Sequence, residues 1–497
     1  MVLPQTDLDL SGVPPLVLRR THISGYRYGH CFGTSWASTL DERLELLGSG
    51  AAWARADGSV LVYPTLPGDE GEEIWPLDGD RLPLTYVETS ALGDITYAVR
   101  DPRTALTRRF TGNPHKSGGL YWLRETEDRN GNVIRIGRTG DGLPTTVVHG
   151  GGYRVLVSCD PERSRVTAQA LQTPDGPVQV RSFGYDGDGN LEAVTNSSGL
   201  PMLFTYDAEG RITSWTDRND STYQYVYDSS GRVIRTVGPD GFLSSAFTYE
   251  VHSETGHGVT RYTDSTGATT VFHINEAFQV VAETDPLGHT TYFEFDAQDQ
   301  LLAQTDALGH STRFERDAHG SLVGLVAPDG VRTTAVYNEM RQPVEVTERG
   351  GIRRSYAYDQ QGNRTAVIEP TGARTEYEFN DRGHVTGVRN AVGDVTRITS
   401  DAAGLPLRIT APDGASTVCA RDAFGRVTTV TDALGGTLRQ GWTVEGKPAW
   451  RELPDGTREE WTWDAEGNLV GHTDRMGRTT SSTATHFDLP ATTRTAE

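Results

Sequence analysis

The sequence predicts an all-β fold in which most of the chain forms one long antiparallel sheet, with two strands in each 21-residue repeat. The repeat is marked by a glycine column at Gly288, Gly309, Gly330, Gly351, Gly372, Gly393, Gly414, Gly435, Gly456 and Gly477. A fixed period of this length indicates a structure built by stacking one small unit.

Each unit contains two turn motifs. In one unit, Asp296-Ala-Gln-Asp299 is followed by Asp306-Ala-Leu-Gly309. Aspartate at the first position of a type I turn accepts hydrogen bonds from the N–H groups of the turn, and glycine at the fourth position tolerates a positive φ. About six or seven residues separate the turns, which is an ordinary strand length. The unit therefore predicts two strands and two tight turns.

Apolar side chains alternate in the strand before the first turn. Phe293 and Phe295 flank Glu294, and Trp461 and Trp463 flank Thr462. A period of two places one set of side chains on a buried face and the other on a solvated face. Stacked units then align the aromatic rings in columns, where they pair across strands.

The first turns place the repeat array at residues 118–497. Their opening residues are Asp186, Asp207 and Asp228, then Asn275, Asp296, Asp317, Asn338, Asp359, Asn380, Asp401, Asp422, Thr443, Asp464 and Thr485. We divide the array into a degenerate start (118–185), a regular run (186–248), an insertion near 249–270 and a second regular run (271–497).

Residues 1–117 lack the 21-residue period. The short alternating segments Leu16-Val-Leu-Arg19 and Val60-Leu-Val-Tyr63 predict a small N-terminal β domain. We place its boundary near Gly118, because Asp128-Arg-Asn-Gly131 already has the form of a repeat turn.

The length of the array predicts how far it curves. Some thirty strands at about 4.8 Å spacing give a sheet roughly 150 Å long, or a ring about 50 Å across. We therefore expect about one turn: a band with exposed edges that does not enclose a cargo by itself.

Charge limits the classes of partner. The net charge is −21, which argues against a nucleic-acid-binding surface and against binding to an anionic membrane. No stretch has the length of a transmembrane helix. Met1–Leu16 contains Asp7 and Asp9 and lacks a basic region followed by an apolar one, so no classical signal peptide is expected.

The repeat motifs resemble a known family. Tyr206-Asp207-Ala-Glu-Gly210-Arg-Ile and Tyr227-Asp228-Ser-Ser-Gly231-Arg-Val resemble the YD repeat of RHS (rearrangement hotspot) proteins, whose relatives include the C components of insecticidal toxin complexes and the animal teneurins. Gly33-Thr-Ser-Trp36-Ala-Ser-Thr-Leu40-Asp-Glu-Arg-Leu44 is similar to the β domain that precedes the repeats in many bacterial RHS toxins.

The resemblance implies a sheet that spirals into a hollow shell around a C-terminal toxin. Bacterial members close this shell with a core segment that begins Asp-Pro-x-Gly. Asp285-Pro-Leu-Gly288 has that form, but it shares a column with Asp306-Ala-Leu-Gly309, so we interpret it as a repeat turn. We expect the toxin and the rest of the shell to be absent from residues 1–497.

Three motifs are candidate sites. Asp186-Gly-Asp188-Gly-Asn190 hints at a calcium loop, but Leu191 and Ser197 stand where an EF-hand needs glycine and a carboxylate. His289 and His310 follow column glycines and are expected to be exposed turn residues. Gly446-Lys447 is followed by Pro448, so it is no complete phosphate loop.

The cysteines are expected to be structural. Cys159 and Cys419 fall in the aromatic columns and are interpreted as small buried apolar residues rather than reactive thiols. Cys31 follows His30 directly, which is not a metal-ligand spacing. We predict no catalytic, cofactor-binding or metal-binding residues.

The leading hypothesis is a non-enzymatic wall segment of a bacterial secreted RHS toxin, whose partners are a toxin cargo and the remaining shell, with secretion machinery or a receptor as further candidates. The alternative is an extracellular or cell-surface module that binds glycan or protein. An enzyme within the N-terminal domain is a third hypothesis.

Overall fold

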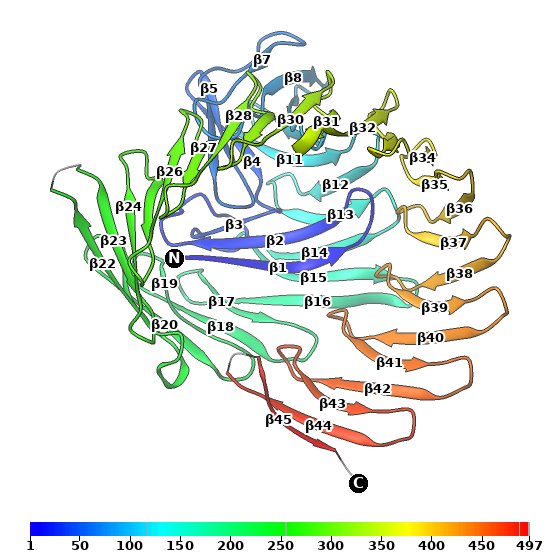
Figure 1. Ribbon diagram of the computed structural model, residues 1–497. Helices are drawn as coiled ribbons and strands as arrows, with labels where there is room; N and C mark the ends of the chain where they lie inside the picture. Colours follow the sequence, from blue (N-terminus) through cyan, green and yellow to red (C-terminus); the bar gives the residue numbers. More distant parts are fainter. Residues whose placement is uncertain (117, 254–255, 487, 496–497) are drawn as a thin grey trace.

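A computed structural model describes residues 1–116, 118–253, 256–486 and 488–495. These residues form strands, turns and two short 3-10 helices, Pro239–Gly241 and Arg349–Gly351. Strands β1–β3 make a small sheet, and β4–β45 belong to one long antiparallel sheet (Figure 1). The predicted all-β class, with two strands per repeat, is confirmed.

The strands before the repeats are β1 (Val2–Leu10), β2 (Leu16–Ile23), β3 (Trp36–Ser38), β4 (Arg43–Leu47), β5 (Gly50–Ala54), β6 (Val60–Tyr63), β7 (Glu73–Ile74), β8 (Leu84–Thr89), β9 (Ile95–Arg100) and β10 (Thr107–Gly112). The first part of the array contains β11 (Leu120–Glu127), β12 (Val133–Arg138), β13 (Pro144–His149), β14 (Arg154–Asp160), β15 (Arg165–Thr173), β16 (Gly176–Tyr185), β17 (Leu191–Thr195), β18 (Pro201–Tyr206), β19 (Ile212–Thr216), β20 (Thr222–Tyr227), β21 (Val233–Val237), β22 (Ser245–Val251) and β23 (Gly258–Thr263).

The second part contains β24 (Thr269–Ile274), β25 (Val280–Thr284), β26 (Thr290–Phe295), β27 (Leu301–Thr305), β28 (Ser311–Arg316), β29 (Leu322–Val326), β30 (Arg332–Tyr337), β31 (Pro343–Glu348), β32 (Ile352–Tyr358), β33 (Arg364–Ile368), β34 (Arg374–Phe379), β35 (Val385–Arg389), β36 (Val395–Ser400), β37 (Pro406–Thr410), β38 (Ser416–Arg421), β39 (Val427–Thr431), β40 (Thr437–Trp442), β41 (Pro448–Glu452), β42 (Arg458–Trp463), β43 (Leu469–Thr473), β44 (Thr479–Ala484) and β45 (Pro490–Thr495).

The strand pairing joins the N-terminal segment to the array. β4 pairs with β11, and β11 also pairs with β10 and β12, so the sheet branches at β11. Gly118 lies in the connection between β10 and β11, and these two strands pair with each other in the same sheet. The expected strands near residues 16–19 and 60–63 are present as β2 and β6. The pairings found in the described residues do not close the long sheet into a barrel.

The turns have the predicted geometry. The Gly309 N–H donates to the Asp306 carbonyl at 3.0 Å, and Gly309 has φ of 83°. Oδ1 of Asp306 accepts from the N–H groups of Leu308 at 2.9 Å and His310 at 2.8 Å. The aspartate thus satisfies the turn's own donors, which is why this residue type recurs.

Each first turn of the regular array also closes a hairpin with a β-bulge. The register shifts between Ala357 and Tyr358 where β32 pairs with β33, whereas β33 pairs with β34 without a shift. A bulge interrupts the ladder and leaves backbone groups in need of other partners. The Tyr358 hydroxyl donates to such a carbonyl, that of Pro343 beside the preceding bulge, at 2.8 Å.

This hydrogen bond recurs along the column that precedes the first turn. Other donors to the carbonyl beside the previous bulge are Tyr185, Tyr206, Tyr227, Tyr249, Tyr337, Arg421, Trp442 and Trp463. Tyrosine, tryptophan and arginine can replace one another at this position because each combines a large side chain with a hydrogen-bond donor. The bond links one hairpin to the next.

The remaining residues of the Tyr-Asp-x-x-Gly-Arg motif add to this link. Arg211 pairs with Asp207 at 2.6 Å, and its guanidinium lies 4.7 Å from the ring centroid of Tyr227 in the next unit. Arg232 repeats both contacts with Asp228 and Tyr249. Arginine therefore connects its own turn to the next column side chain.

The predicted alternation of faces is confirmed, but the buried face is incompletely covered. In β26, Phe293 and Phe295 are partly buried, whereas Tyr292 and Glu294 are exposed. Trp461 and Trp463 are also only partly buried. The inner face of a single-layered sheet is shielded only by the curvature of the sheet. These rings therefore stay partly exposed unless another segment packs on them.

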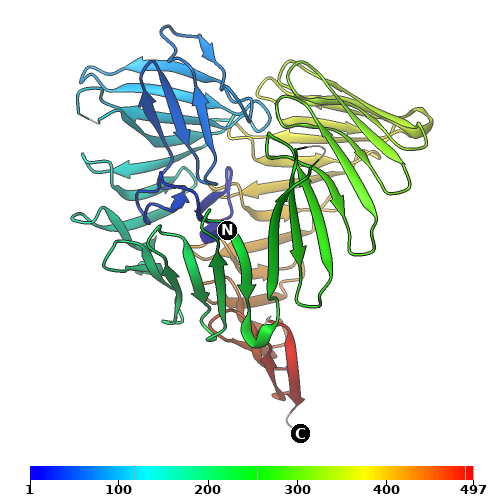
Figure 2. The ribbon, with the colours of Figure 1, turned by 90° about the vertical axis from the view of Figure 1, so that its left-hand side faces the viewer.

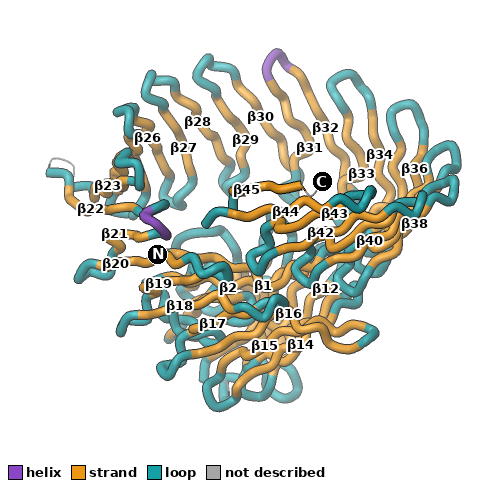
Figure 3. The backbone as a smooth tube through the Cα atoms, turned by 90° about the horizontal axis from the view of Figure 1, so that it is seen from below, coloured by secondary structure: helices purple, strands orange, loops and turns teal. Residues whose placement is uncertain are grey.

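The sheet spirals and overlaps itself (Figure 3). Asn130 contacts Asn363, 233 residues further on, and Asn196 contacts Ala465, 269 residues further on. The expectation of about one turn is therefore wrong. The β11–β12 turn contacts the β32–β33 turn, so one revolution consists of the strands between them, β12–β32. These strands give a circumference of only about 100 Å, since strands lie about 4.8 Å apart.

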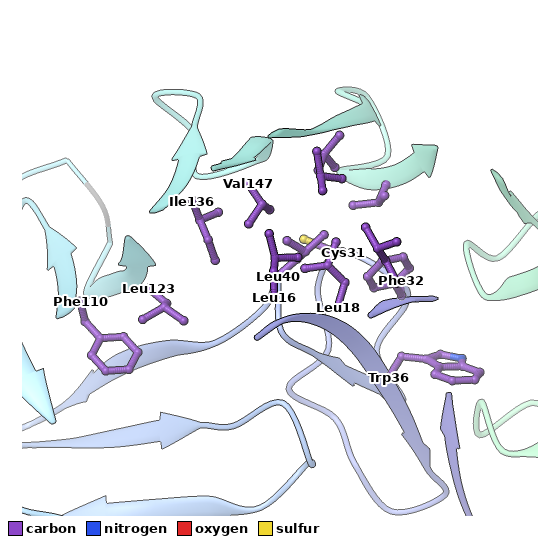
Figure 4. Close-up of a cluster of buried hydrophobic side chains, with 14 of the residues drawn as sticks. Leu16, Leu18, Cys31, Phe32, Trp36, Leu40, Phe110, Leu123, Ile136 and Val147 are labelled. Carbon is purple, nitrogen blue, oxygen red and sulfur yellow. The ribbon is translucent and has the colours of Figure 1, made fainter. Parts of the chain in front are cut away.

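The main hydrophobic core lies where β1–β3 packs against the first revolution (Figures 2 and 4). Leu16 and Leu18 of β2 are buried with Ile136 and Val147 of the long sheet. Figure 2 shows the N-terminal strands between two walls of the spiral. This small sheet covers the face that the rest of the array leaves partly open.

The hydrogen bond to the bulge carbonyl can be tested at Tyr358. Tyr358→Phe removes the hydroxyl and leaves the partly buried Pro343 carbonyl without this donor. We expect a loss of about 0.5–1.5 kcal/mol in the free energy of unfolding, measured by urea denaturation. Tyr292→Phe is the control, because that side chain is 55% exposed. Equal effects of the two substitutions would contradict the role of the column donor.

Candidate functional site: the concave face and the seam between revolutions

The aromatic columns face the inside of the spiral. Phe183 of β16 and Phe204 of β18 pack edge to face on Phe32 and Trp36, with ring centroids 5.0 and 5.5 Å apart. Trp36 also donates through Nε1 to the Tyr206 hydroxyl at 3.0 Å. The units share one register, so the same columns in later strands face the same side.

A line of contacts joins the first revolution to the second, and we call it the seam. It runs between the turns at 128–132, 149–152, 196–199 and 217–221 and those at 362–363, 382–384, 401–404, 443–446, 464–467 and 486. At one end, Arg129 Nη1 donates to the Gly362 carbonyl at 2.6 Å, and Asn132 Nδ2 donates to that of Arg382 at 2.9 Å. Further along, Asn219 Nδ2 donates to Asp464 Oδ2 at 3.0 Å. The seam is mainly polar, because turns rather than strand faces meet there.

An ion pair lies within the seam. Arg218 Nη1 and Glu466 Oε1 are 3.1 Å apart, and their side chains are only 10% and 14% exposed. The Arg218 backbone N–H also donates to Glu466 Oε1 at 2.6 Å. Nearby, Ser197 donates from its N–H and its hydroxyl to the carboxylate of Glu445. These carboxylates each accept more than one donor, which favours their burial.

The loop between β1 and β2 touches both revolutions. The Val13 N–H donates to the Ala403 carbonyl at 3.0 Å, in the second revolution. His149, in the first revolution, donates from Nε2 to the Pro14 carbonyl at 2.8 Å and accepts the Gly151 N–H on Nδ1 at 2.8 Å. Burial lowers the pKa of His149, and the hydrogen bond to Pro14 opposes this shift. The loop thus forms hydrogen bonds to both revolutions that meet at the seam.

Comparison with known proteins agrees with these features. A family model described as RHS Repeat matches residues 206–243, 295–332, 342–374 and 401–437, and one described as a domain of unknown function (DUF6531) matches residues 1–63. The matched repeats contain the turns and column donors described above. This chain therefore contains RHS repeats.

Its fold has a counterpart among solved structures. A crystal structure of TcdB2-TccC3 aligns with a TM-score of 0.55 and 13% identity, covering 97% of this chain and 31% of that one. A crystal structure of TcdB2-TccC3-Cdc42 aligns with a TM-score of 0.47 and 13% identity, covering 100% of this chain and 32% of that one. At this identity the likeness concerns the fold alone.

One curated relative has a named activity. Double-stranded DNA deaminase toxin A of Burkholderia cenocepacia (strain H111) is 25% identical over 198 residues, which are 39% of this chain and 13% of the relative. The RHS-repeat chain therefore spans only a fraction of each of these longer proteins.

The other candidate residues serve the turns in which they lie. Asp186 Oδ1 accepts from the N–H groups of Asp188 and Asn190, both at 2.9 Å, as in any repeat turn. His289 and His310 each lie 3.0 Å from the aspartate of their own turn and are exposed. Among the described residues no helix is both long and apolar enough to span a bilayer.

The structure brings Asp41 to His30 and Cys31, a grouping that sequence spacing had not suggested. Their ligand-type atoms lie within 4.8 Å of one another. The Asp41 carboxylate accepts the N–H of Cys31 at 2.9 Å and that of His30 at 3.1 Å. Burial raises the pKa of the Cys31 thiol well above its usual range, and Asp41 adds to the shift. This arrangement orders the loop and disfavours a thiolate.

The remaining cysteines are less buried than expected. Cys159 and Cys419 are partly exposed and, like Cys31, form no disulfide. Burial raises the pKa of Cys159 to about 11, which keeps the thiol protonated at neutral pH.

The seam residues were missed from sequence. Arg218 and Glu466 are 248 residues apart, and each occupies a turn position where many residue types are allowed. The only local signal was asparagine at the third position of turns, as in Asn130 and Asn219. It indicates a turn, but not what the turn contacts.

Loss of one partner of the seam ion pair is expected to loosen the second revolution. Glu466→Ala leaves Arg218 nearly buried without its carboxylate, which should cost about 2–3 kcal/mol. Hydrogen exchange should rise in β42–β44 and remain unchanged in β13–β16. Glu460→Ala, which breaks the exposed pair with Arg458, is the control. Uniform exchange changes along the chain would refute a local seam.

Stability is expected to fall in mild acid. The pKa of His149 in the folded chain lies below its ordinary value of 6.5, so below about pH 6.5 the unfolded chain takes up a proton that the folded chain excludes. The stabilisation is complete above this pH and is lost as the pH falls. His149→Gln should reduce the drop in urea midpoint between pH 7.5 and 5.5.

His115→Gln, on the exposed turn after β10, is the matched control for this titration. An identical pH dependence in wild type and His149→Gln would show that this histidine has no part in it.

Proposed function

We propose that the RHS-repeat chain is a non-enzymatic wall segment of a toxin-associated shell, and that its concave face encloses a toxin cargo. The observation that supports this most is the seam: successive revolutions of one sheet are joined turn to turn, over contacts 233–269 residues apart. A wall whose revolutions overlap and are joined in this way suits a container better than a single binding surface.

The inner face supports the same function. Beyond the part covered by β1–β3, the aromatic columns are only partly buried, as in β26 and β42, and retain apolar surface toward the inside of the spiral. Such a lining suits a polypeptide that is held unfolded or loosely folded, since apolar segments bury surface against it. The cargo and the remaining shell are the proposed partners, and no cofactor is proposed.

The named relatives are consistent with this role. One is called a toxin, and the fold resembles that of TcdB2-TccC3. We propose that this chain, like a toxin shell, acts outside the producing bacterium, either secreted or at the cell surface. Deaminase chemistry is not proposed for residues 1–497, because the alignment covers 13% of that relative.

The alternative is a recognition module that binds glycan or protein through the outer face. The two functions differ in which face is used: a container needs the concave face and an intact seam, whereas a recognition module needs an exposed patch and tolerates a loosened seam.

The coding sequence downstream of Glu497 gives the first test. The container hypothesis predicts a shell-closing segment and a toxin domain there. We then expect the toxin, expressed with this chain in one polypeptide, to resist a protease that digests the free toxin. Glu466→Ala should make it sensitive, whereas Glu460→Ala should not. Digestion of the toxin in the unsubstituted protein would refute enclosure.

A further inference from the structure

A polar cleft lies outside the seam, between the N-terminal strands and the array. It has a volume of about 530 Å³. Its walls come from the β7–β8 loop, the β9–β10 turn and the first turns after β26, β28 and β30. Figure 1 shows β7 and β8 beside β28, β30 and β31. Ligand sites have volumes of this order.

The repeat departs from its turn rule at this cleft. The fourth position of the first turn is Asp299 after β26 and Arg341 after β30, where most units have glycine. Both residues have left-handed backbones, with φ of 60° and 58°. This conformation is disfavoured for residues other than glycine. Two charged side chains have thus replaced glycine at the positions that line the cleft.

The cleft is also positively charged in an acidic protein. Four arginines (Arg81, Arg103, Arg316 and Arg341) and two aspartates (Asp80 and Asp299) line it, although the whole chain has a net charge of −21. The two aspartates already have partners: Asp80 lies 2.9 Å from Arg55, and Asp299 accepts from Gln279.

Three of these arginines have no carboxylate partner among the described residues. In the part of the chain that the structure describes, Arg81, Arg316 and Arg341 form no ion pair within 4.0 Å. Arg81 lies over the Trp75 ring at 5.4 Å, and Arg341 reaches only His319, at 3.4 Å. The Nε of Arg316 is buried without a hydrogen-bond partner. Buried N–H groups normally have one.

We propose that this cleft binds a small polyanion that carries phosphate or carboxylate groups. Guanidinium groups bind such oxyanions through paired N–H donors. An anion between Arg316 and Arg341 would supply the missing acceptors. It would also bridge the N-terminal segment, through Arg81, to the turns of β28–β31, so binding should stabilise the folded chain.

The test is calorimetric titration of residues 1–497 with inorganic pyrophosphate and, separately, with citrate at low ionic strength. Binding of either supports the site, and the tighter of the two identifies the preferred group. The bound anion should raise the melting temperature. Binding of neither would overturn the proposal.

Arg341→Gly separates binding from folding. It restores the repeat's glycine, so it should not lower the melting temperature, yet it should weaken anion binding at least tenfold. Arg316→Gln should weaken binding to a similar extent. Phe278→Gly is the matched control, because Phe278 occupies the same turn position with φ of 61° and does not line the cleft. Unchanged affinity in both arginine variants would overturn the proposal.

Discussion

The rest of the structure depends on the hydrogen bond that tyrosine, tryptophan or arginine in the column donates to the carbonyl beside the preceding bulge. Without it, the first-turn hairpins that precede these residues would contain a bulge carbonyl that lacks this donor. Tyr358 and Trp463 supply this donor to Pro343 and Pro448 at 2.8 and 2.7 Å. Proline is tolerated at the acceptor position because only its carbonyl is used.

The curvature of the sheet follows from the same bulges. They occur in hairpins closed by first turns, such as β26–β27, and not in those closed by second turns, such as β27–β28. An extra residue on one strand bends and twists the sheet locally. Because the bulge recurs at the same place in each unit, the bends add, and the sheet meets itself again after 233–269 residues.

The local features could be predicted from sequence because they depend on residues close to one another. Asp306 caps a turn whose donors lie two and four residues away, and Phe293 and Phe295 alternate within one strand. The seam could not be predicted, because the pairing of Arg218 with Glu466 depends on the number of strands in a revolution. The number of strands in a revolution is set by the sum of many small bends. If the predicted number is wrong by one strand, each turn is paired with the wrong neighbour.

The extent of burial also depends on this geometry. A buried aromatic face was expected along the array, but β1–β3 pack mainly against the first revolution. Phe204 is therefore buried against Trp36, whereas Trp461 and Trp463, in later strands, are partly exposed. Identical repeat positions thus differ in environment according to the revolution in which they lie.

Departures from the repeat have to be judged against this background. Phe278 breaks the glycine rule of the first turn as Arg341 does, yet its side chain is 90% exposed and does not line this cleft. A left-handed residue by itself therefore identifies no site. At Asp299 and Arg341 the same departure coincides with a cleft, an excess of arginine and an unpartnered Nε on Arg316. A functional position can depart from a local rule when another interaction compensates the free-energy cost. Here the compensating interaction would be the binding of the anion.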